Sequence, residues 1–216
     1  MVLGAEYENW NLARSTFLTR YLGRRFFAGR TVLIVGAGHG EIGATLYDLG
    51  AAVTCSDGRP AHLDHIQREY PYLSTRCDDL DSATLALPSV HAVIHFGTLY
   101  HLRNAAKGIR DAAAAAPYVI LESLVTDSPD PECCPREDES TWQDQSLYGI
   151  GCRPSWAFIE AQWRLLGLAF VRVEDPILNA GLRQYTWAPE APAIPERRRM
   201  WIAWRPDMPC PFAGEG

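Results

Sequence analysis

The 216-residue sequence lacks several features that mark particular classes of protein. No stretch reaches the roughly 18 apolar residues of a membrane-spanning helix, and no basic segment leads into an apolar run near Met1. None of the six cysteines stands in a Cys-x-x-Cys pair, which counts against a zinc site and favours free thiols over a disulfide framework. The single lysine, Lys107, has Arg103 four residues before it, so the Tyr-x-x-x-Lys pair of short-chain oxidoreductases is absent. We expect a cytoplasmic protein with no membrane partner.

The composition and charge suit one acidic globular domain. Apolar residues make up 47% of the chain and charged residues 21%, which supports a sizeable core. The 26 acidic residues outnumber the 20 basic ones and give a net charge of -6. Nucleic acid is not expected as a partner, because no general positive field would attract it. The length fits a single α/β domain.

Apolar segments typical of strands alternate with segments of helical periodicity along most of the chain. The strands are expected at residues 31–35, 52–56, 72–76, 90–96, 118–122, 168–173 and 199–204, and helices at 41–49, 60–70, 104–116 and 155–166. Strands that are apolar throughout and separated by helices are typical of parallel sheets covered on both faces. We predict an α/β fold: one domain built on a doubly wound, mainly parallel seven-stranded sheet with helices on both faces.

Three segments flank or interrupt this pattern. Residues 10–27 place Leu12 and other apolar side chains at helical spacing, which predicts an amphipathic helix on the sheet or a lid over a ligand. Residues 126–145 show almost no apolar periodicity and are expected to form a functional or mobile loop. The expected division of the chain is an N-terminal helix or lid (1–29), a Rossmann-like domain (30–205) and a flexible tail (206–216).

The expected first strand ends in a glycine-rich turn, Gly36-Ala37-Gly38-His39-Gly40, which opens the following helix. Glycines let the backbone turn sharply and approach a ligand, and the helix offers its free amide groups. Asp57 ends the second strand, where a carboxylate is placed to accept hydrogen bonds from both ribose hydroxyls. Together these features predict a site for a ligand that contains adenosine.

The register of the glycines distinguishes between two kinds of ligand. The dinucleotide pattern Gly-x-Gly-x-x-Gly fails when counted from Gly36, because its sixth position is Glu41. A match that starts at Gly38 comes two residues late with respect to the strand. Counted from Gly36, the pattern is Gly-x-Gly-x-Gly, which disfavours a dinucleotide as the ligand.

The run Val-Leu-Ile-Val-Gly-Ala-Gly-His-Gly (32–40), with Asp57 downstream, resembles motif I and its acidic partner in class I S-adenosylmethionine-dependent methyltransferases. The resemblance covers about residues 30–125 and includes the Leu-Tyr-His-Leu segment (99–102) after the fourth strand. It implies S-adenosylmethionine as the cofactor and S-adenosylhomocysteine as the product. The cofactor-binding residues that it implies are Gly36, Ala37, Gly38, His39, Gly40, Asp57, Gly58, Asp78 or Asp79 at the adenine, and Phe96 and Gly97 near the sulfonium.

Methyl transfer is an in-line displacement that needs aligned reactants and, for a hydroxyl acceptor, a base that removes its proton. His101 follows the fourth strand by a few residues, and a histidine ordinarily titrates near working pH, so we predict it as the catalytic base. The alternative roles for His101 are a helix cap or a packed core residue. Tyr100, Arg153 and Ser155 are predicted to bind the substrate, while a helix cap is the simpler role for Ser155.

Carboxylates crowd the chain after the expected fifth strand, from Glu122 to Glu132. Such groups bind a divalent cation in some O-methyltransferases, but a solvated Pro-Asp-Pro-Glu run needs none, and we expect no metal. The predicted function is O-methylation of a small-molecule or carbohydrate acceptor, and a homodimer is compatible with the sequence. An NAD(P)-binding short-chain oxidoreductase, a nucleic-acid methyltransferase and a non-catalytic cofactor-binding subunit are the alternatives.

Overall fold

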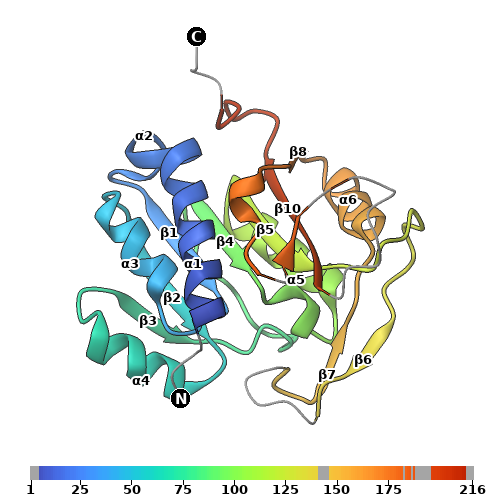
Figure 1. The fold of residues 1–216 in the computed structure, drawn as a ribbon, viewed down its shortest axis with the longest axis horizontal. Helices are drawn as coiled ribbons and strands as arrows, with labels where there is room; N and C mark the ends of the chain where they lie inside the picture. Colours follow the sequence, from blue (N-terminus) through green and yellow to red (C-terminus); the bar gives the residue numbers. More distant parts are fainter. Residues whose placement is uncertain (1–4, 141–145, 182, 186, 188–195, 213–216) are drawn as a thin grey trace.

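A mixed β-sheet forms the centre of the molecule (Figure 1). The computed structural model describes residues 5–140, 146–181, 183–185, 187 and 196–212. The main strands lie in the order β3-β2-β1-β4-β5-β10-β8. Their bounds are Thr31–Val35 (β1), Ala52–Asp57 (β2), Ser74–Cys77 (β3), Ala92–Phe96 (β4), Tyr118–Leu124 (β5), Ala169–Val173 (β8) and Glu196–Trp204 (β10).

Strands β1 to β5 run parallel, so their carboxyl ends meet at one edge of the sheet. β10 runs antiparallel to both of its neighbours, β5 and β8. The chain moves outward from β1 to β3 in one direction and then from β4 to β5 in the other, and ligands bind at such a reversal in open α/β sheets. The predicted mainly parallel seven-stranded sheet is confirmed, and the short β9 (Arg183–Gln184) adds an eighth strand beside β10.

Helices cover both faces because alternate side chains of the buried strands are apolar on both sides. Ile34 of β1 packs into a core cluster with residues of the N-terminal helices, α3 and α4, whereas its neighbour Leu33 packs into a second cluster with residues of α5 and α6. The bounds of these helices are Glu41–Asp48 (α3), Pro60–Glu69 (α4), Ala105–Ala115 (α5) and Trp156–Leu165 (α6). None of the helices in these described ranges has the length and apolar character to cross a membrane.

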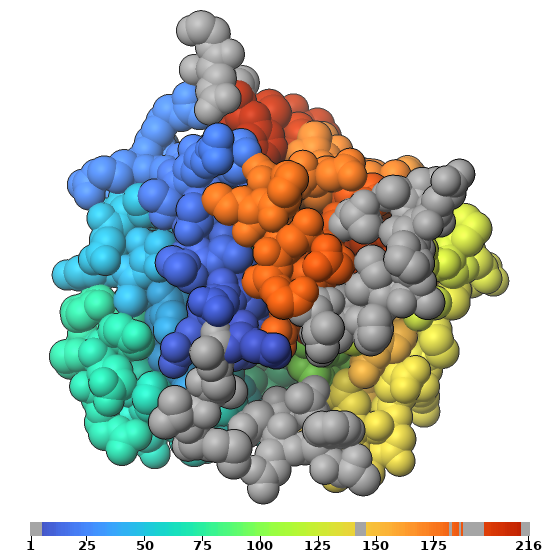
Figure 2. All heavy atoms as spheres, in the orientation of Figure 1, coloured from blue at the N-terminus to red at the C-terminus, as the bar shows by residue number. Residues whose placement is uncertain are grey.

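The N-terminal segment forms α1 (Ala5–Phe17), a π-helical turn (Leu18–Leu22) and α2 (Gly23–Phe27). Four of its apolar side chains belong to the core of the sheet: Phe17, Leu18, Leu22 and Phe27. In the space-filling view α1 (blue) lies against the segment near Pro176–Leu178 (orange), with which it is in contact (Figure 2). The helix therefore packs on the sheet, as the first of the two interpretations predicts.

The apolar stripe predicted for this helix is wrong at Leu12, whose residue is 64% exposed. Arg14, two residues later, is only 3% exposed. Its guanidinium turns inward to the buried carboxylate of Glu122, and this ion pair takes the place that an apolar side chain would fill. A buried carboxylate needs such a partner, and the helical periodicity of apolar residues does not reveal it.

The segment predicted as a loop without secondary structure contains a strand. β6 (Arg136–Asp138) pairs antiparallel with β7 (Ile150–Cys152) as a separate two-stranded ribbon. All three residues of β6 are exposed and charged, so no alternation of apolar and polar side chains marks the strand in the sequence. Residues 141–145 of the predicted loop lie outside the described residues.

Candidate active site

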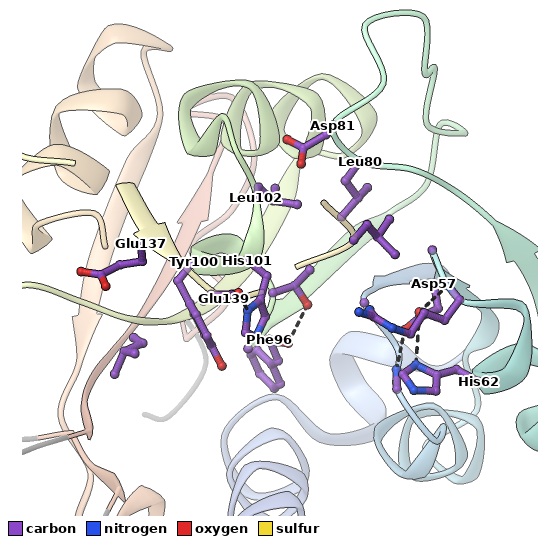
Figure 3. A pocket seen from close by; sticks show the side chains of 18 of the residues that line it. Asp57, His62, Leu80, Asp81, Phe96, Tyr100, His101, Leu102, Glu137 and Glu139 are labelled. Carbon is purple, nitrogen blue, oxygen red and sulfur yellow. Dashed lines mark hydrogen bonds and ion pairs between the residues drawn. The ribbon is translucent and has the colours of Figure 1, made fainter. Parts of the chain in front are cut away.

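A cavity of about 750 Å³ opens at the carboxyl edge of the sheet, over the ends of β1, β2 and β4 (Figure 3). Twelve of the residues predicted for the site line it: Gly36, Gly38, His39, Asp57, Gly58, Asp78, Asp79, Phe96, Gly97, Tyr100, His101 and Arg153. Asp57 and His62 lie on one side of the view, with Tyr100, His101 and Glu139 on the other (Figure 3). The fold thus brings most of the predicted residues into one site.

Three predicted residues do not line the cavity. Ala37 packs against the core, and Gly40 precedes α3 with a φ of 95° and lies against Ile66, 2.9 Å from where its Cβ would stand. Ser155 is fully buried at the start of α6. Its hydroxyl accepts a hydrogen bond from the Phe158 amide at 2.8 Å and donates one to the Asp130 carbonyl at 2.6 Å. Ser155 therefore caps a helix, the simpler of the two roles considered for it, and does not line the cavity.

The glycine turn is locked to the end of β4. Gly36 has a φ of 66°, and a Cβ placed on it would stand 1.9 Å from the Thr98 Oγ1. That hydroxyl donates to the carbonyl oxygens of Phe96, at 3.1 Å, and Val35, at 3.3 Å. The hydroxyl thus ties the ends of two neighbouring strands together, and only glycine leaves room for it.

We expect Gly36→Ala to lower the free energy of unfolding by about 2–5 kcal/mol. The left-handed conformation costs an alanine about 1–2 kcal/mol, and displacement of Thr98 adds about 1–3 kcal/mol. Gly167→Ala is the matched control, because Gly167 has a φ of 68° and nothing stands within 4 Å of its Cβ position. Urea denaturation of both variants separates the backbone strain, which they share, from the clash with Thr98, which only Gly36→Ala has. An equal loss of unfolding free energy in the two variants would contradict a tight contact at Thr98.

Asp57 projects from the end of β2 with its carboxylate held on both sides. Oδ2 accepts a hydrogen bond from the Gly38 amide at 3.0 Å, and Oδ1 accepts one from the Arg59 amide at 2.9 Å. The His62 Nδ1 lies 3.2 Å from Oδ1. Burial alone would raise the pKa of Asp57, but the contact with His62 and the two amides outweigh it and hold the pKa below its ordinary value. Asp57 is therefore an ionised acceptor, and Oδ2 has room for a further donor.

The two neighbouring aspartates after β3 differ in their free acceptor capacity. Asp78 is held by Arg76, whose Nε and Nη2 lie 2.5 and 2.8 Å from its two oxygens, and it accepts a third contact from the Ser56 hydroxyl at 2.7 Å. Asp79 accepts from the Asp81 amide at 3.0 Å and from the Tyr148 hydroxyl at 2.5 Å. A carboxylate has about four acceptor positions, so Asp79 retains more of them for a ligand.

His101 is paired with a buried carboxylate that the sequence did not point to. The His101 Nδ1 lies 2.6 Å from the Glu139 Oε2, which also accepts from the Ser146 amide at 3.0 Å. Arg153 donates to the other oxygen of Glu139 at 2.9 Å. Burial alone would raise the pKa of Glu139, but these three donors outweigh it and keep the carboxylate ionised. An ionised carboxylate only accepts, so Nδ1 carries the proton and Nε2 has the free lone pair.

The pKa of His101 lies below its ordinary value. Burial is the largest cause, because it disfavours the charged imidazolium. The contact with Glu139 opposes this effect, while the positive charges of Arg153 and Arg198 add to it. His101 is thus neutral at neutral pH, with a carboxylate in place to stabilise the imidazolium that forms when it takes a proton. A neutral imidazole backed by a carboxylate is chemically able to accept a proton.

Several residues that line the cavity belong to no sequence motif. Trp10 and Arg14 come from α1, and Arg198 comes from β10, while Glu139 follows β6. For Arg198 one signal existed: a charge inside a strand whose later residues are apolar. Such a charge must find a partner if the strand is central, and Arg198 finds Glu122 of β5.

Comparisons with known proteins bear on the fold. No protein-family model matches the chain, and a search of curated proteins gives no match. The structure is similar to the N-terminal domain of EvdMO1 with S-adenosylhomocysteine bound, at a TM-score of 0.66 and 18% identity over 91% of this chain and 80% of that one. It is also similar to an S-adenosylmethionine-dependent methyltransferase from Mesorhizobium loti, at a TM-score of 0.64 and 15% identity over 89% and 98% of the two chains.

A third similar structure is magnesium protoporphyrin IX methyltransferase from Synechocystis with bound S-adenosylhomocysteine, at a TM-score of 0.61 and 15% identity over 93% of this chain and 84% of that one. The predicted class is confirmed at the level of architecture: the chain has the fold of the class I S-adenosylmethionine-dependent methyltransferases.

Proposed function

We propose that the protein is an S-adenosylmethionine-dependent methyltransferase that methylates a hydroxyl group of a small molecule or sugar. The observation that carries this proposal is the His101–Glu139 pair, which faces the same cavity as the glycine turn and Asp57. One half of the cavity is suited to adenosine, and the other half holds a base that can take a proton from an acceptor.

The residues of the adenosine half fit the cofactor. The glycine turn leaves backbone exposed to the cavity at Gly36 and Gly38, and Asp57 offers an ionised acceptor for the ribose hydroxyls. Asp79, with its remaining acceptor positions, suits the amino group of adenine. When bound, S-adenosylmethionine supplies a methyl group activated by the positive sulfur.

The residues of the other half suit an oxygen nucleophile. The free Nε2 of His101 accepts the acceptor's hydroxyl proton as the oxygen attacks, and Glu139 stabilises the resulting positive ring. The neutral state of the ring at physiological pH keeps this nitrogen available. Tyr100, whose ring centroid lies 4.0 Å from that of His101, forms the adjoining wall.

The structure favours this proposal over the two catalytic alternatives. A dinucleotide-binding Rossmann sheet is parallel in the order 3-2-1-4-5-6, whereas β10 here is antiparallel between β5 and β8. A nucleic-acid methyltransferase needs a basic surface, whereas this chain carries a net charge of -6.

Calorimetric titration with S-adenosylhomocysteine tests the cofactor. We expect binding to the wild type, no comparable binding of NAD(H), and a loss of about 10- to 100-fold in affinity for Asp57→Asn, because a hydrogen bond to a charged group contributes about 1.5–3 kcal/mol. Asp64→Asn, at an exposed position of α4, is the matched control. Binding of NAD(H) alone would overturn the proposed function.

A further inference from the structure

Three arginine side chains surround one tryptophan at the end of the cavity beyond Phe96. The guanidinium carbons of Arg14, Arg198 and Arg183 lie 3.6, 4.3 and 4.5 Å from ring centroids of Trp10. The Trp10 Nε1 donates to the Tyr185 hydroxyl at 2.7 Å, which fixes the ring. All three arginines line the cavity, so their charges are presented to whatever occupies it.

The positive charge in this arginine–tryptophan pocket exceeds the negative charge that faces it. The side chains of Arg14 and Arg198 are only 4% and 5% exposed, and both lie against the single carboxylate of Glu122. Arg198 donates to the Glu122 Oε1 at 3.0 Å, while Arg14 lies 3.5 Å from Oε2. Their other polar side-chain contacts, with Asn11 and Tyr100, are to neutral groups. Two buried cations thus share one anion, and a bound anion would offset the surplus.

The guanidinium groups also retain unused donors. The Nε atoms of Arg14 and Arg198 are buried and have no hydrogen-bond partner among the described residues. Guanidinium groups bind carboxylates and phosphates through pairs of parallel N–H donors. The pocket therefore combines positive charge with guanidinium groups whose hydrogen bonding is incomplete, two properties that suit an oxyanion.

The pocket adjoins both the end of β4, where Trp10 lies 3.3 Å from the Cβ position of Gly97, and the base. Arg198 donates to the Tyr100 hydroxyl at 3.0 Å, and the Tyr100 ring lies beside His101. Arg198 comes from β10, two strands beyond β4 in the sheet, whereas the adenosine half is built on β1 and β2. Asp57 and Tyr100 lie on different sides of the cavity in Figure 3. An anionic group held by Arg198 would place the rest of its molecule next to His101.

We propose that the arginine–tryptophan pocket binds a carboxylate or phosphate of the methyl acceptor, so that the substrate class is an anionic hydroxy compound. This inference rests on the proposed function, because the anion can belong to a methyl acceptor only if the protein is a methyltransferase. The other source of the same chemistry is the carboxylate of the cofactor's methionine, and the experiment below separates the two.

Inorganic phosphate and 4-hydroxybenzoate serve as anionic probes, with 4-hydroxybenzamide as the neutral counterpart. We expect the wild-type protein saturated with S-adenosylhomocysteine to bind an anionic probe with one site at millimolar concentration and to bind the amide more weakly. Arg198→Met should weaken binding about tenfold or more, because it removes a paired donor and its charge. Arg25→Met, at an exposed position of α2, should leave it unchanged.

The outcomes distinguish the two proposals. Equal anion affinity in wild type and Arg198→Met, or no anion binding by the wild type, overturns the acceptor pocket. 5′-Methylthioadenosine lacks the carboxylate of S-adenosylhomocysteine. If Arg198→Met loses affinity for S-adenosylhomocysteine but not for 5′-methylthioadenosine, the pocket binds the cofactor, and the proposal of an acceptor pocket is overturned. If the wild type does not bind S-adenosylhomocysteine but still binds phosphate through Arg198, the proposed methyltransferase function is overturned, while the pocket remains an anion-binding site. If the methionine variant does not fold, Arg198→Gln removes the charge but keeps a polar side chain, and it provides the same comparison.

Discussion

Replacement of His101 by alanine is expected to lower the turnover number about 10²- to 10⁴-fold, the range that a positioned general base contributes. The affinity for S-adenosylhomocysteine should stay within about threefold of wild type, because His101 faces the acceptor half of the cavity. The reason for the large effect is that no other described side chain combines a neutral lone pair with a buried carboxylate behind it at this position.

The measurement is the release of S-adenosylhomocysteine with anionic hydroxy compounds that the wild type methylates, together with calorimetry for the cofactor. His91→Asn is the matched control, since His91 packs against Phe26 and Tyr118, away from the cavity. A turnover number unchanged in His101→Ala would remove this residue from the mechanism. A parallel loss of cofactor affinity would show instead that His101 supports the shape of the site.

The adenosine half of the site was predictable because its signals are local. Gly36 and Gly38 follow a strand directly, and their positive φ values, 66° and 56°, are conformations that glycine favours. Asp57 ends the next strand, so the parallel pairing of β1 with β2 brings it to the glycine turn without further information. The position of His101 after β4 is predictable for the same reason.

In the acceptor half, the arginine–tryptophan pocket and Glu139 were not predictable, because their contacts join distant segments. Arg14 and Glu122 are 108 residues apart, and Glu122 and Arg198 are 76 apart. In the sequence such charges look like surface residues, and only the placement of α1 and β10 around β5 shows that they are buried together. Glu139 follows a strand without apolar alternation, so its contact with His101 emerges only from the tertiary structure.

The division of charge across the cavity connects these two halves. Asp57, Asp78, Asp79 and Asp81 line the side suited to ribose and adenine, whereas the three arginines around Trp10 line the wall next to Tyr100; the carboxylates of residues 137–139 line the cavity as well. A neutral or cationic acceptor would gain nothing from the arginines, whereas an anionic one is drawn toward them and away from the aspartates. Burial is the largest cause of the lowered pKa of His101, and the charge of Arg198 adds to it, so one arginine of the pocket acts both on the acceptor and on the base.

Replacement of Glu139 by glutamine is expected to lower the turnover number about 100-fold or more, as loss of the carboxylate behind a catalytic histidine does when the wrong ring tautomer forms. A glutamine can accept from or donate to Nδ1, so the lone pair on Nε2 is no longer fixed. The affinity for S-adenosylhomocysteine should change little, because Glu139 contacts His101, Arg153 and Ser146 rather than the adenosine half.

The pH profile of turnover distinguishes this role from a merely structural one. His101 acts as a base only when neutral, and its pKa lies below the ordinary value of 6.5, so wild-type activity should reach its plateau at a lower pH than an ordinary histidine allows and fall as the pH drops through the lowered pKa. Glu139 raises the pKa of His101, so removal of its charge lowers that pKa further. The acidic limb of the Glu139→Gln profile should therefore move to lower pH, while the turnover number at the plateau falls. Glu132 is an exposed carboxylate outside the cavity, so Glu132→Gln should match the wild type in both the limb and the plateau. A limb that stays in place or moves to higher pH would contradict direct pairing of this carboxylate with the base.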